Sequence, residues 1–290
     1  MKRLYFSLKF CFYSTLILAF ALLATVLIVF QKYSKDLPKL DSLKDYNPYV
    51  LSEVFADDGS KIGEYWQERR VVLSPQEIPK TFEQAMIASE DASFFQHSGL
   101  DYLSIVRAMM QNIKAGHIVQ GASTITQQVV TSFLLTKQRK WERKIKEAIL
   151  AKRIEENFSK QEILYLYLNQ VYFGNRAYGI EAAAQNYFHK SAAELNIAAT
   201  AMIVGLVKAP HRFSPIRNFP RAKVRQEYVL DRMLHEGFIS KEQAEKAKNE
   251  PLTMYVAPTD KEYNLRYAPW FVEEVRRDII QRYGDVSCTR

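Results

Sequence analysis

The sequence predicts a mainly α-helical protein with an N-terminal transmembrane helix and a small β hairpin close to the membrane. Three observations support this fold class. A long uncharged segment lies near the N-terminus, a short alternating segment surrounds the dipeptide Asp58-Gly59, and helical patterns follow from about Ser74 onward. With 290 residues, 48% of them hydrophobic, the chain can form one large domain or two small ones.

The uncharged segment is residues 10–30, FCFYSTLILAFALLATVLIVF. A helix needs roughly 20 apolar residues to cross the bilayer core, so this segment is long enough. A cleaved signal peptide has a shorter apolar core of about 7–15 residues, which favours an uncleaved signal anchor. Basic residues before the segment favour a cytoplasmic tail over residues 1–9, although Lys32 and Lys35 beyond it weaken that preference.

Residues 31–48 contain two prolines and are expected to form a linker. Beyond it, Asp58-Gly59 is a favoured hairpin turn between the strands VLSEVF and KIGEYW. The sequence SPQEIP then predicts a capped turn, with Ser74 as the N-cap and Pro75 in the first position.

The rest of the chain is a series of helical patterns without an internal repeat. They cover residues 81–96, 101–115, 123–135, 140–157, 160–169, 177–187, 191–208, 220–236, 240–248 and 268–283. The two cysteines lie near opposite ends of the chain and indicate neither a disulfide framework nor a metal site.

The net charge of +8 is unevenly distributed. Residues 137–153 alone carry eight Lys or Arg against two Glu. A nucleic-acid partner is not expected, because this cluster is short and the chain is predicted to lie mostly outside the cytoplasm.

The stretch IASEDASFFQHSG carries the first candidate group, Glu90 and Asp91, followed by Phe94, Phe95 and His97. A carboxyl group beside apolar side chains tends to have a raised pKa, which suits a general acid or base. The alternative is a helix end with two exposed acids.

The stretch GASTITQQ combines a glycine with hydroxyl and amide side chains at the start of a helix. Ser123 or Thr124 can cap that helix, and Gln127 and Gln128 lie one turn further on. Such a helix N-terminus suits phosphate or sugar oxygens. The alternative is an ordinary N-cap followed by two solvated amides.

The stretch RKWERKIKEAILAKR places Arg143 four residues before Glu147. The first interpretation is an exposed helix with ion pairs. The second is an anion-binding wall whose carboxylate is kept charged by cations, the opposite of Glu90. Two carboxylates with pKa values moved apart are typical of acid–base pairs.

The stretch SKQEILYLYLNQVYFGNRAYG is the fourth candidate region. Asn169, Gly174 and several tyrosines interrupt its helical pattern. Tight helix packing around glycine and alanine accounts for most of these residues.

Taken together and in this order, these stretches resemble the peptidoglycan glycosyltransferase (transglycosylase) domain of class A penicillin-binding proteins, glycosyltransferase family 51. The resemblance covers roughly residues 38–250. The positions that match the five family motifs are Glu90, Asp91, Phe94, His97 and Gly99; Gly121, Ser123, Thr124, Thr126, Gln127 and Gln128; Arg143, Lys144 and Glu147; Lys160, Ile163, Leu164, Tyr167, Leu168 and Asn169; and Arg225, Val229, Leu230 and Met233.

The sequence departs from the family pattern at two places. The second motif usually continues with a Lys-Asn pair, where this chain has Thr131 and Ser132, and the fourth motif often has Glu where this chain has Tyr165. The missing lysine affects substrate affinity more than catalysis, because both acids are present.

The resemblance implies a lysozyme-like glycosyltransferase domain over residues 49–250. Residues 251–290 resemble the start of a connector to a transpeptidase domain, whose motifs are absent, so penicillin binding is not expected. The implied location is the bacterial inner (plasma) membrane, with a single-pass anchor and the catalytic domain on the outer, periplasmic face.

The resemblance also implies an activity: polymerisation of lipid II into β-1,4 glycan strands, with inversion and release of undecaprenyl pyrophosphate. The catalytic residues would be Glu90 and Glu147. The substrate-binding residues would be Asp91, Phe94, His97, Gly99, Gly121, Ser123, Thr124, Gln127, Gln128, Arg143, Lys144 and Asn169.

The implied partners are lipid II, the growing glycan strand, the membrane and, as an option, a separate transpeptidase. A divalent cation, Mg²⁺ or Mn²⁺, near Glu147 is a further option, and no organic cofactor is expected. Two alternatives remain open: a catalytically weak, membrane-anchored scaffold that binds lipid II, and a lysozyme-like glycan hydrolase.

Overall fold

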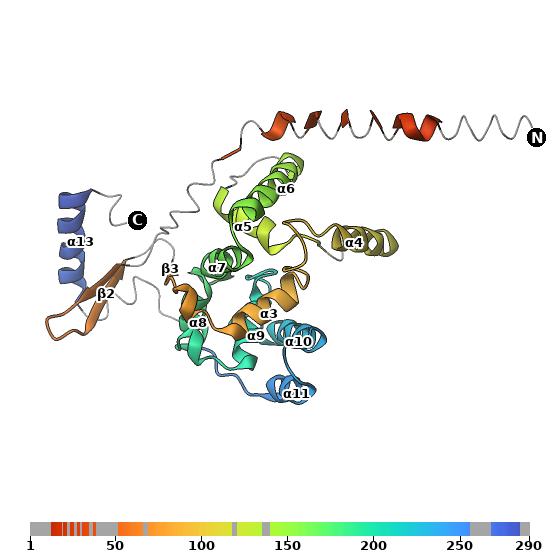
Figure 1. Ribbon diagram of the computed structural model, residues 1–290. Coiled ribbons are helices and arrows are strands. Elements are labelled where there is room, and N and C mark those ends of the chain that lie inside the picture. The colour runs from red at the N-terminus through yellow and green to blue at the C-terminus, as the bar shows by residue number, and fades with distance from the viewer. Residues whose placement is uncertain are drawn as a thin grey trace, which may run out of the picture.

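A computed structural model describes residues 13–18, 20–21, 24–25, 28–29, 31–34, 37–38, 52–65, 69–117, 121–134, 140–255 and 268–284. The described part is mainly helical, as the sequence predicts, with five short strands (Figure 1). In this part of the chain, helices carry nearly all of the core.

The predicted anchor, residues 10–30, lies partly outside the described residues, and its described pieces are helical. No helix in the described ranges is long and apolar enough to cross a membrane. The predicted tail, residues 1–9, and most of the predicted linker also fall outside those ranges.

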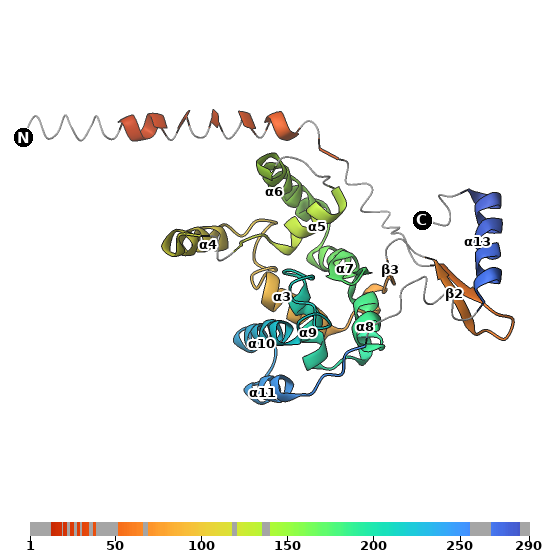
Figure 2. The same cartoon turned by 180° about the vertical axis from the view of Figure 1, so that it is seen from behind.

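The predicted hairpin is present. Strands β1 (Ser52–Phe55) and β2 (Lys61–Tyr65) pair antiparallel. Their turn is closed by a hydrogen bond from the Ser60 amide to Asp58 Oδ1 (2.8 Å), and Gly59 has a φ of +80°. Both views place the hairpin beside α13 (Pro269–Tyr283), away from the main helical body (Figures 1 and 2). The hairpin therefore packs with the predicted connector, although its sequence lies within the predicted domain.

The centre of the main body is α9 (Ile197–Leu206), which is apolar on all sides and buried from Ala198 to Leu206. A helix without a polar face must be covered by other elements. Helices α3 (Lys80–Glu90) and α10 (Phe219–His235) cover it, and α11 (Lys241–Asn249) packs on α10 (Figure 1).

A second group of helices packs together next to this centre. It consists of α5 (Ile125–Leu134), α6 (Lys140–Asn157) and α7 (Lys160–Gln170). Thus the two candidate carboxylates lie in different groups, Glu90 at the end of α3 and Glu147 within α6.

The sequence patterns do not predict a small three-stranded sheet that the structure contains. Strand β5 (Ala177–Tyr178) lies between β3 (Arg69–Arg70), to which it is parallel, and β4 (Tyr172–Gly174), to which it is antiparallel.

The helix predicted over residues 177–187 therefore begins later, as α8 (Ile180–Phe188). Gly179 precedes it with a φ of +82°, and a Cβ there would lie 2.7 Å from the Asn169 carbonyl oxygen. Only glycine fits this approach, so the turn and the helix start are fixed together.

Two other predicted helices are shorter than expected. The pattern over residues 81–96 ends at Glu90, because the next residues form turns. The pattern over residues 191–208 divides into the short 3₁₀ helix η2 (Ala192–Glu194) and α9. The predicted turn at Ser74 is present as η1 (Pro75–Glu77), closed by a 2.7 Å bond from the Ser74 amide to Glu77 Oε2.

Helix α4 (Tyr102–Ala115) projects from the body in both views (Figures 1 and 2). The Asp101 carboxylate caps it by accepting a hydrogen bond from the Ser104 amide (2.8 Å). Ala108 is its one buried residue.

Candidate active site

Glu90 is placed by the end of α3. The helix buries Phe82, Ala85 and Met86 in the core, and Asp91 ends it with a backbone hydrogen bond to the Ile87 carbonyl (3.0 Å). Its last side chain therefore turns toward α5 and α10, and only 14% of it is exposed.

Each carboxylate oxygen of Glu90 has a different neighbour. Gln128 Nε2, on α5, donates a hydrogen bond of 3.2 Å to Oε2. One terminal nitrogen of Arg225, on α10, lies 3.6 Å from Oε1, too far for a hydrogen bond but close enough for an electrostatic interaction.

Burial raises the pKa of the Glu90 carboxyl above its ordinary value. The hydrogen bond from Gln128 and the charges of Arg225 and Lys208 oppose this rise, and the neighbouring Asp91 adds to it. A carboxylate with a raised pKa is a stronger base than a solvated one. The sequence prediction of a carboxyl group with a raised pKa is confirmed.

One of the two aromatic residues differs from the apolar surroundings that the sequence predicted for the acids. Phe94 is fully buried, but Phe95 is 56% exposed. Lys160 Nζ lies 4.4 Å from the centre of the Phe94 ring. Phe94 therefore belongs to the core, and Phe95 does not bury the acids.

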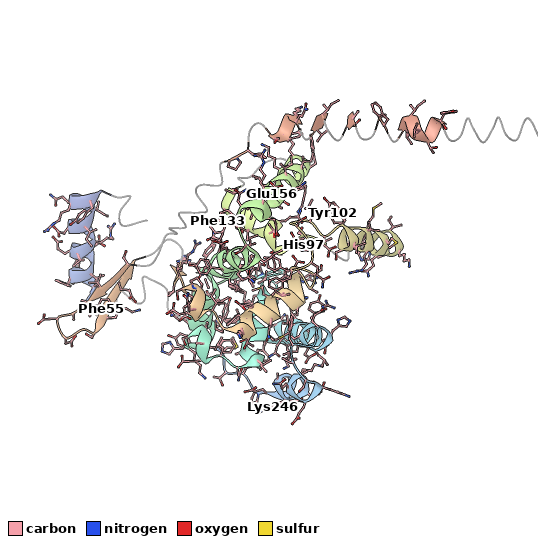
Figure 3. The ribbon with its side chains drawn as sticks, in the orientation of Figure 1. Phe55, His97, Tyr102, Phe133, Glu156 and Lys246 are labelled. Carbon is pink, nitrogen blue, oxygen red and sulfur yellow. The ribbon has the colours of Figure 1, made fainter. Side chains whose placement is uncertain are left out.

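Asp91 and His97 hold the loop that follows α3. Nε2 of His97 lies 3.0 and 3.1 Å from the two Asp91 oxygens, and Oδ2 also accepts from the Ile125 amide (2.9 Å). The Gly99 amide donates to His97 Nδ1 (3.2 Å). Figure 3 shows His97 in the loop between α3 and α4. The substrate-binding role of Asp91 and His97 stays a prediction, because their polar atoms are already bonded within the protein.

Gly99, Thr124 and Gln127 connect this loop to the start of α5. Thr124 Oγ1 donates to the Gly99 carbonyl (2.7 Å) and accepts from the Gln127 amide (3.2 Å). Gln127 Oε1 in turn accepts from the Thr124 amide (3.0 Å). Thr124 is thus the cap that the sequence had left undecided between Ser123 and Thr124, and the Gln127 side chain completes a capping box.

Gly121 and Ser123, by contrast, are exposed. Ser123 Oγ accepts a hydrogen bond of 3.1 Å from Lys144 Nζ, on α6. The start of α5 therefore meets the basic helix at a position that solvent can reach.

Glu147 lies among cations, as the sequence predicted. Its carboxylate is almost fully buried, with Lys144 Nζ 2.5 Å from one oxygen and Arg143 Nε 3.2 Å from the other. The Lys144 side chain is 53% exposed and that of Arg143 35%. This geometry leaves two cations accessible to an anionic ligand while their counter-charge is buried beneath them.

Helix α5 connects the surroundings of the two glutamates. Gln128 contacts Glu90, and Ser123 contacts Lys144, which pairs with Glu147. Ser123 lies just before α5 begins, and Gln128 lies in its first turns. The carboxylate and the cationic pair thus lie along one short segment.

Asn169 is placed away from this arrangement. Its side-chain amide is fully buried, accepts from the Leu73 amide (2.9 Å), and donates to the carbonyls of Leu73 and Tyr165. It joins the segment before η1 to α7, and its substrate-binding role stays a prediction.

The sequence reading left three neighbours of the site unassigned. Arg225, Lys208 and Tyr167 all act on Glu90 or its partner Gln128, and two of them already matched family motifs. Sequence spacing could not show that these positions, which lie 77 to 135 residues after Glu90, share one site.

Among the described residues, no group of three or more His, Cys, Asp or Glu side chains could hold a metal ion. Glu147 would be a single carboxylate ligand.

Comparison with known proteins gives a consistent result. A family model described as Transglycosylase matches residues 58–234. The chain is 41% identical over 284 residues to Penicillin-binding protein 1A of Rickettsia bellii, covering 97% of this chain and 36% of that protein. It is 42% identical over 256 residues to Penicillin-binding protein 1A of Neisseria flavescens, covering 88% of this chain and 32% of the relative.

A crystal structure of Penicillin-Binding Protein 1A from Haemophilus influenzae is also similar. It has 27% sequence identity and a TM-score of 0.49, covering 82% of this chain and 25% of that one. The chain spans about a third of the length of the curated relatives that it matches.

Proposed function

This chain belongs to the transglycosylase family, and on that premise we propose that it is a peptidoglycan glycosyltransferase that polymerises lipid II into β-1,4 glycan strands. The observation that carries the proposal is the contrast between two glutamates. Glu90 is largely shielded from solvent and has a raised pKa, and Glu147 is paired with two accessible cations.

The proposed reaction joins the reducing end of the growing strand to the 4-hydroxyl of the incoming sugar. Inversion in one step needs a base on the attacking side and positive charge on the leaving side. Glu90 takes the proton of the 4-hydroxyl onto its carboxylate as the oxygen bonds to the anomeric carbon. Burial favours this step, because the protonated form of Glu90 is the one its surroundings prefer.

Arg143 and Lys144 stabilise the pyrophosphate that leaves from the other side. Both side chains reach solvent, and the Lys144 ammonium can bond a phosphate oxygen while Glu147 holds its orientation. Ser123 lies beside Lys144 and can donate its hydroxyl hydrogen to the same group.

A divalent cation could join this arrangement only by displacing Arg143 or Lys144 from Glu147, because each of them pairs with one carboxylate oxygen. Mg²⁺ commonly takes one or two carboxylates from the protein and its other oxygens from substrate phosphates and water. Glu147 would supply the carboxylate, and the cation would add positive charge beside the leaving group. No organic cofactor is part of the proposal.

A lipid-borne substrate also accounts for α4. The side chains of Leu103, Val106, Met109, Met110 and Ile113 are between 54% and 77% exposed. An exposed amphipathic helix of this kind suits a membrane surface. We place α4 on the outer face of the bacterial inner membrane, where the anchor predicted for residues 10–30 would also hold the chain. A separate transpeptidase would act on the product.

The test is polymerisation of labelled lipid II by the detergent-solubilised chain, compared with Glu90→Gln and with Glu83→Gln on the same helix. Polymer from the native chain and from Glu83→Gln, with a loss of about 10³-fold in Glu90→Gln, supports the proposal. Lipid II binding without polymer would identify a scaffold instead. Release of reducing ends from finished glycan would identify a hydrolase.

A further inference from the structure

A buried tyrosine that has no part in the proposed chemistry is hydrogen-bonded to the partner of Glu90. Tyr167, on α7, is 2% exposed, and its hydroxyl donates to Gln128 Oε1 (2.9 Å). The other end of the same amide, Gln128 Nε2, donates to Glu90 Oε2 (3.2 Å). Three helices thus contribute one residue each to a single line of hydrogen bonds.

This line determines which end of the amide faces Glu90. The two ends of a glutamine amide have nearly the same shape, so packing alone does not choose between them. Burial raises the pKa of the Tyr167 hydroxyl well above its ordinary value, so it keeps its proton. The hydroxyl has no other hydrogen-bond partner among the described residues, and a reversed amide would leave its proton without an acceptor.

We propose that Tyr167 is a positioning residue that holds the NH₂ end of Gln128 against Glu90 and so sets the pH range in which Glu90 can act as a base. This inference rests on the proposed function. In this proposal Tyr167 does not touch the substrate. It acts on the catalytic base, Glu90, by fixing the orientation of the Gln128 amide.

Other groups around Glu90 do not depend on this orientation. Arg225 on α10 and Lys208 after α9 favour the charged carboxylate, and the adjacent Asp91 disfavours it. These charges stay in place when the Gln128 amide reverses. The amide itself changes from a donor that favours the carboxylate to an acceptor that favours the protonated acid.

The test replaces Tyr167 with Phe, which keeps the ring and removes the hydroxyl. The matched control is Tyr187→Phe, because Tyr187 is 1% exposed and its hydroxyl donates to the Phe173 carbonyl (3.0 Å). Polymerisation of lipid II is measured as kcat/KM from acidic to alkaline pH. Tyr167→Phe should move the acidic limb of the profile to higher pH, by about one pH unit. Its rate at alkaline pH should stay close to native, and Tyr187→Phe should leave the limb in place.

A second readout does not require turnover. The difference in Tm between a chain with Glu90 and the same chain with Glu90→Gln, followed against pH, reports the titration of Glu90. The Tyr167→Phe background should shift that titration in the same direction. A native chain that makes no polymer would refute the proposed function, while this titration would still decide the role of Tyr167.

Two results for Tyr167→Phe would overturn the inference. The first is a pH–rate profile and a Glu90 titration that both stay at their native positions. The second is an equal loss of rate at every pH, which would mean that Tyr167 has a structural role alone. If Tyr167→Phe does not fold, Gln128→Leu and the double variant Gln128→Leu/Tyr167→Phe replace it. Removing both buried partners avoids leaving one unpaired. In both variants the acidic limb of the pH–rate profile should move to the same higher pH. An acidic limb at the native pH in Gln128→Leu would refute the inference.

Discussion

The two glutamates of the site are both largely shielded from solvent, with side chains 14% exposed in Glu90 and 2% exposed in Glu147, but they have opposite surroundings. Glu90 receives one amide hydrogen bond and lies 3.6 Å from the nearest guanidinium nitrogen of Arg225. Glu147 has a cation within 3.2 Å of each oxygen. Burial alone therefore does not assign a role to a carboxylate.

The difference follows from where each glutamate lies in the chain. Glu90 ends a helix whose buried face joins the core, and its neighbours come from distant segments. Glu147 lies inside a helix rich in Lys and Arg, and its partners come from the preceding turn. The distant partners of Glu90 oppose the rise in its pKa that burial causes.

The largest expected difference between Glu90 and Glu147 is in how their substitution changes the rate of polymerisation. Glu147→Gln should lower lipid II polymerisation by about 10²-fold, because Arg143 and Lys144 lose the group that orients them. The acidic limb of its pH profile should remain at the native position, since Glu90 is unchanged. Initial rates with labelled lipid II from acidic to alkaline pH measure both quantities. A shifted limb would mean that Glu147 takes part in the proton transfer.

The next effect concerns Arg225. Its charge opposes the rise in the Glu90 pKa, so Arg225→Met should raise that pKa further and move the acidic limb to higher pH. A rise of one pKa unit lowers the rate about tenfold on the acidic side and leaves the alkaline side unchanged.

The control for this change is Arg232→Met. Arg232 is also on α10, but its side chain bonds Glu236 (2.7 Å) and the Ala88 carbonyl (3.1 Å). The same shift in both variants would show that general charge, and not proximity to Glu90, moves the limb.

The smallest effect is on stability, where the two glutamates should differ in sign. The pKa of Glu90 is raised above its ordinary 4.5 in the folded state. The folded state therefore binds more protons than the unfolded state between the two values, and stability falls as pH rises through this interval. Glu90→Gln should raise the Tm at neutral pH, with the gain shrinking near pH 4.

Glu147→Gln should instead lower the Tm at neutral pH. It breaks two ion pairs whose cations are partly solvated, a loss of about 1–2 kcal/mol. Thermal unfolding of both variants in the same detergent measures the contrast. A lower Tm for Glu90→Gln would show that its carboxylate is stabilising, against the direction inferred from its burial.

Local patterns predicted much of the fold. The turn at Asp58-Gly59, the cap at Ser74 and the helix over residues 140–157 all depend on neighbours within a few positions, and all are present. The β3–β5–β4 sheet was missed because its strands have two or three residues, too few for an alternating pattern to appear.

The site was predictable to the same extent. Arg143 and Glu147 are four residues apart on one helix, so the sequence spacing alone predicts that they pair. The neighbours Gln128, Tyr167 and Arg225 approach Glu90 through the packing of three different helices, which no spacing rule encodes. Motif matching selected these positions without saying what they touch.

The contact of Gly99 with α6 has a mechanical consequence. A Cβ at Gly99 would lie 2.8 Å from the Ala151 carbonyl oxygen, so the loop behind Glu90 and the helix of Glu147 meet main chain to main chain. Side chains can yield by changing rotamer, but packed backbones have no such freedom. The approach of this loop to α6 thus has a lower limit set by the main chain. A side chain at Gly99 would therefore push the loop that follows Glu90 away from the helix that carries Glu147.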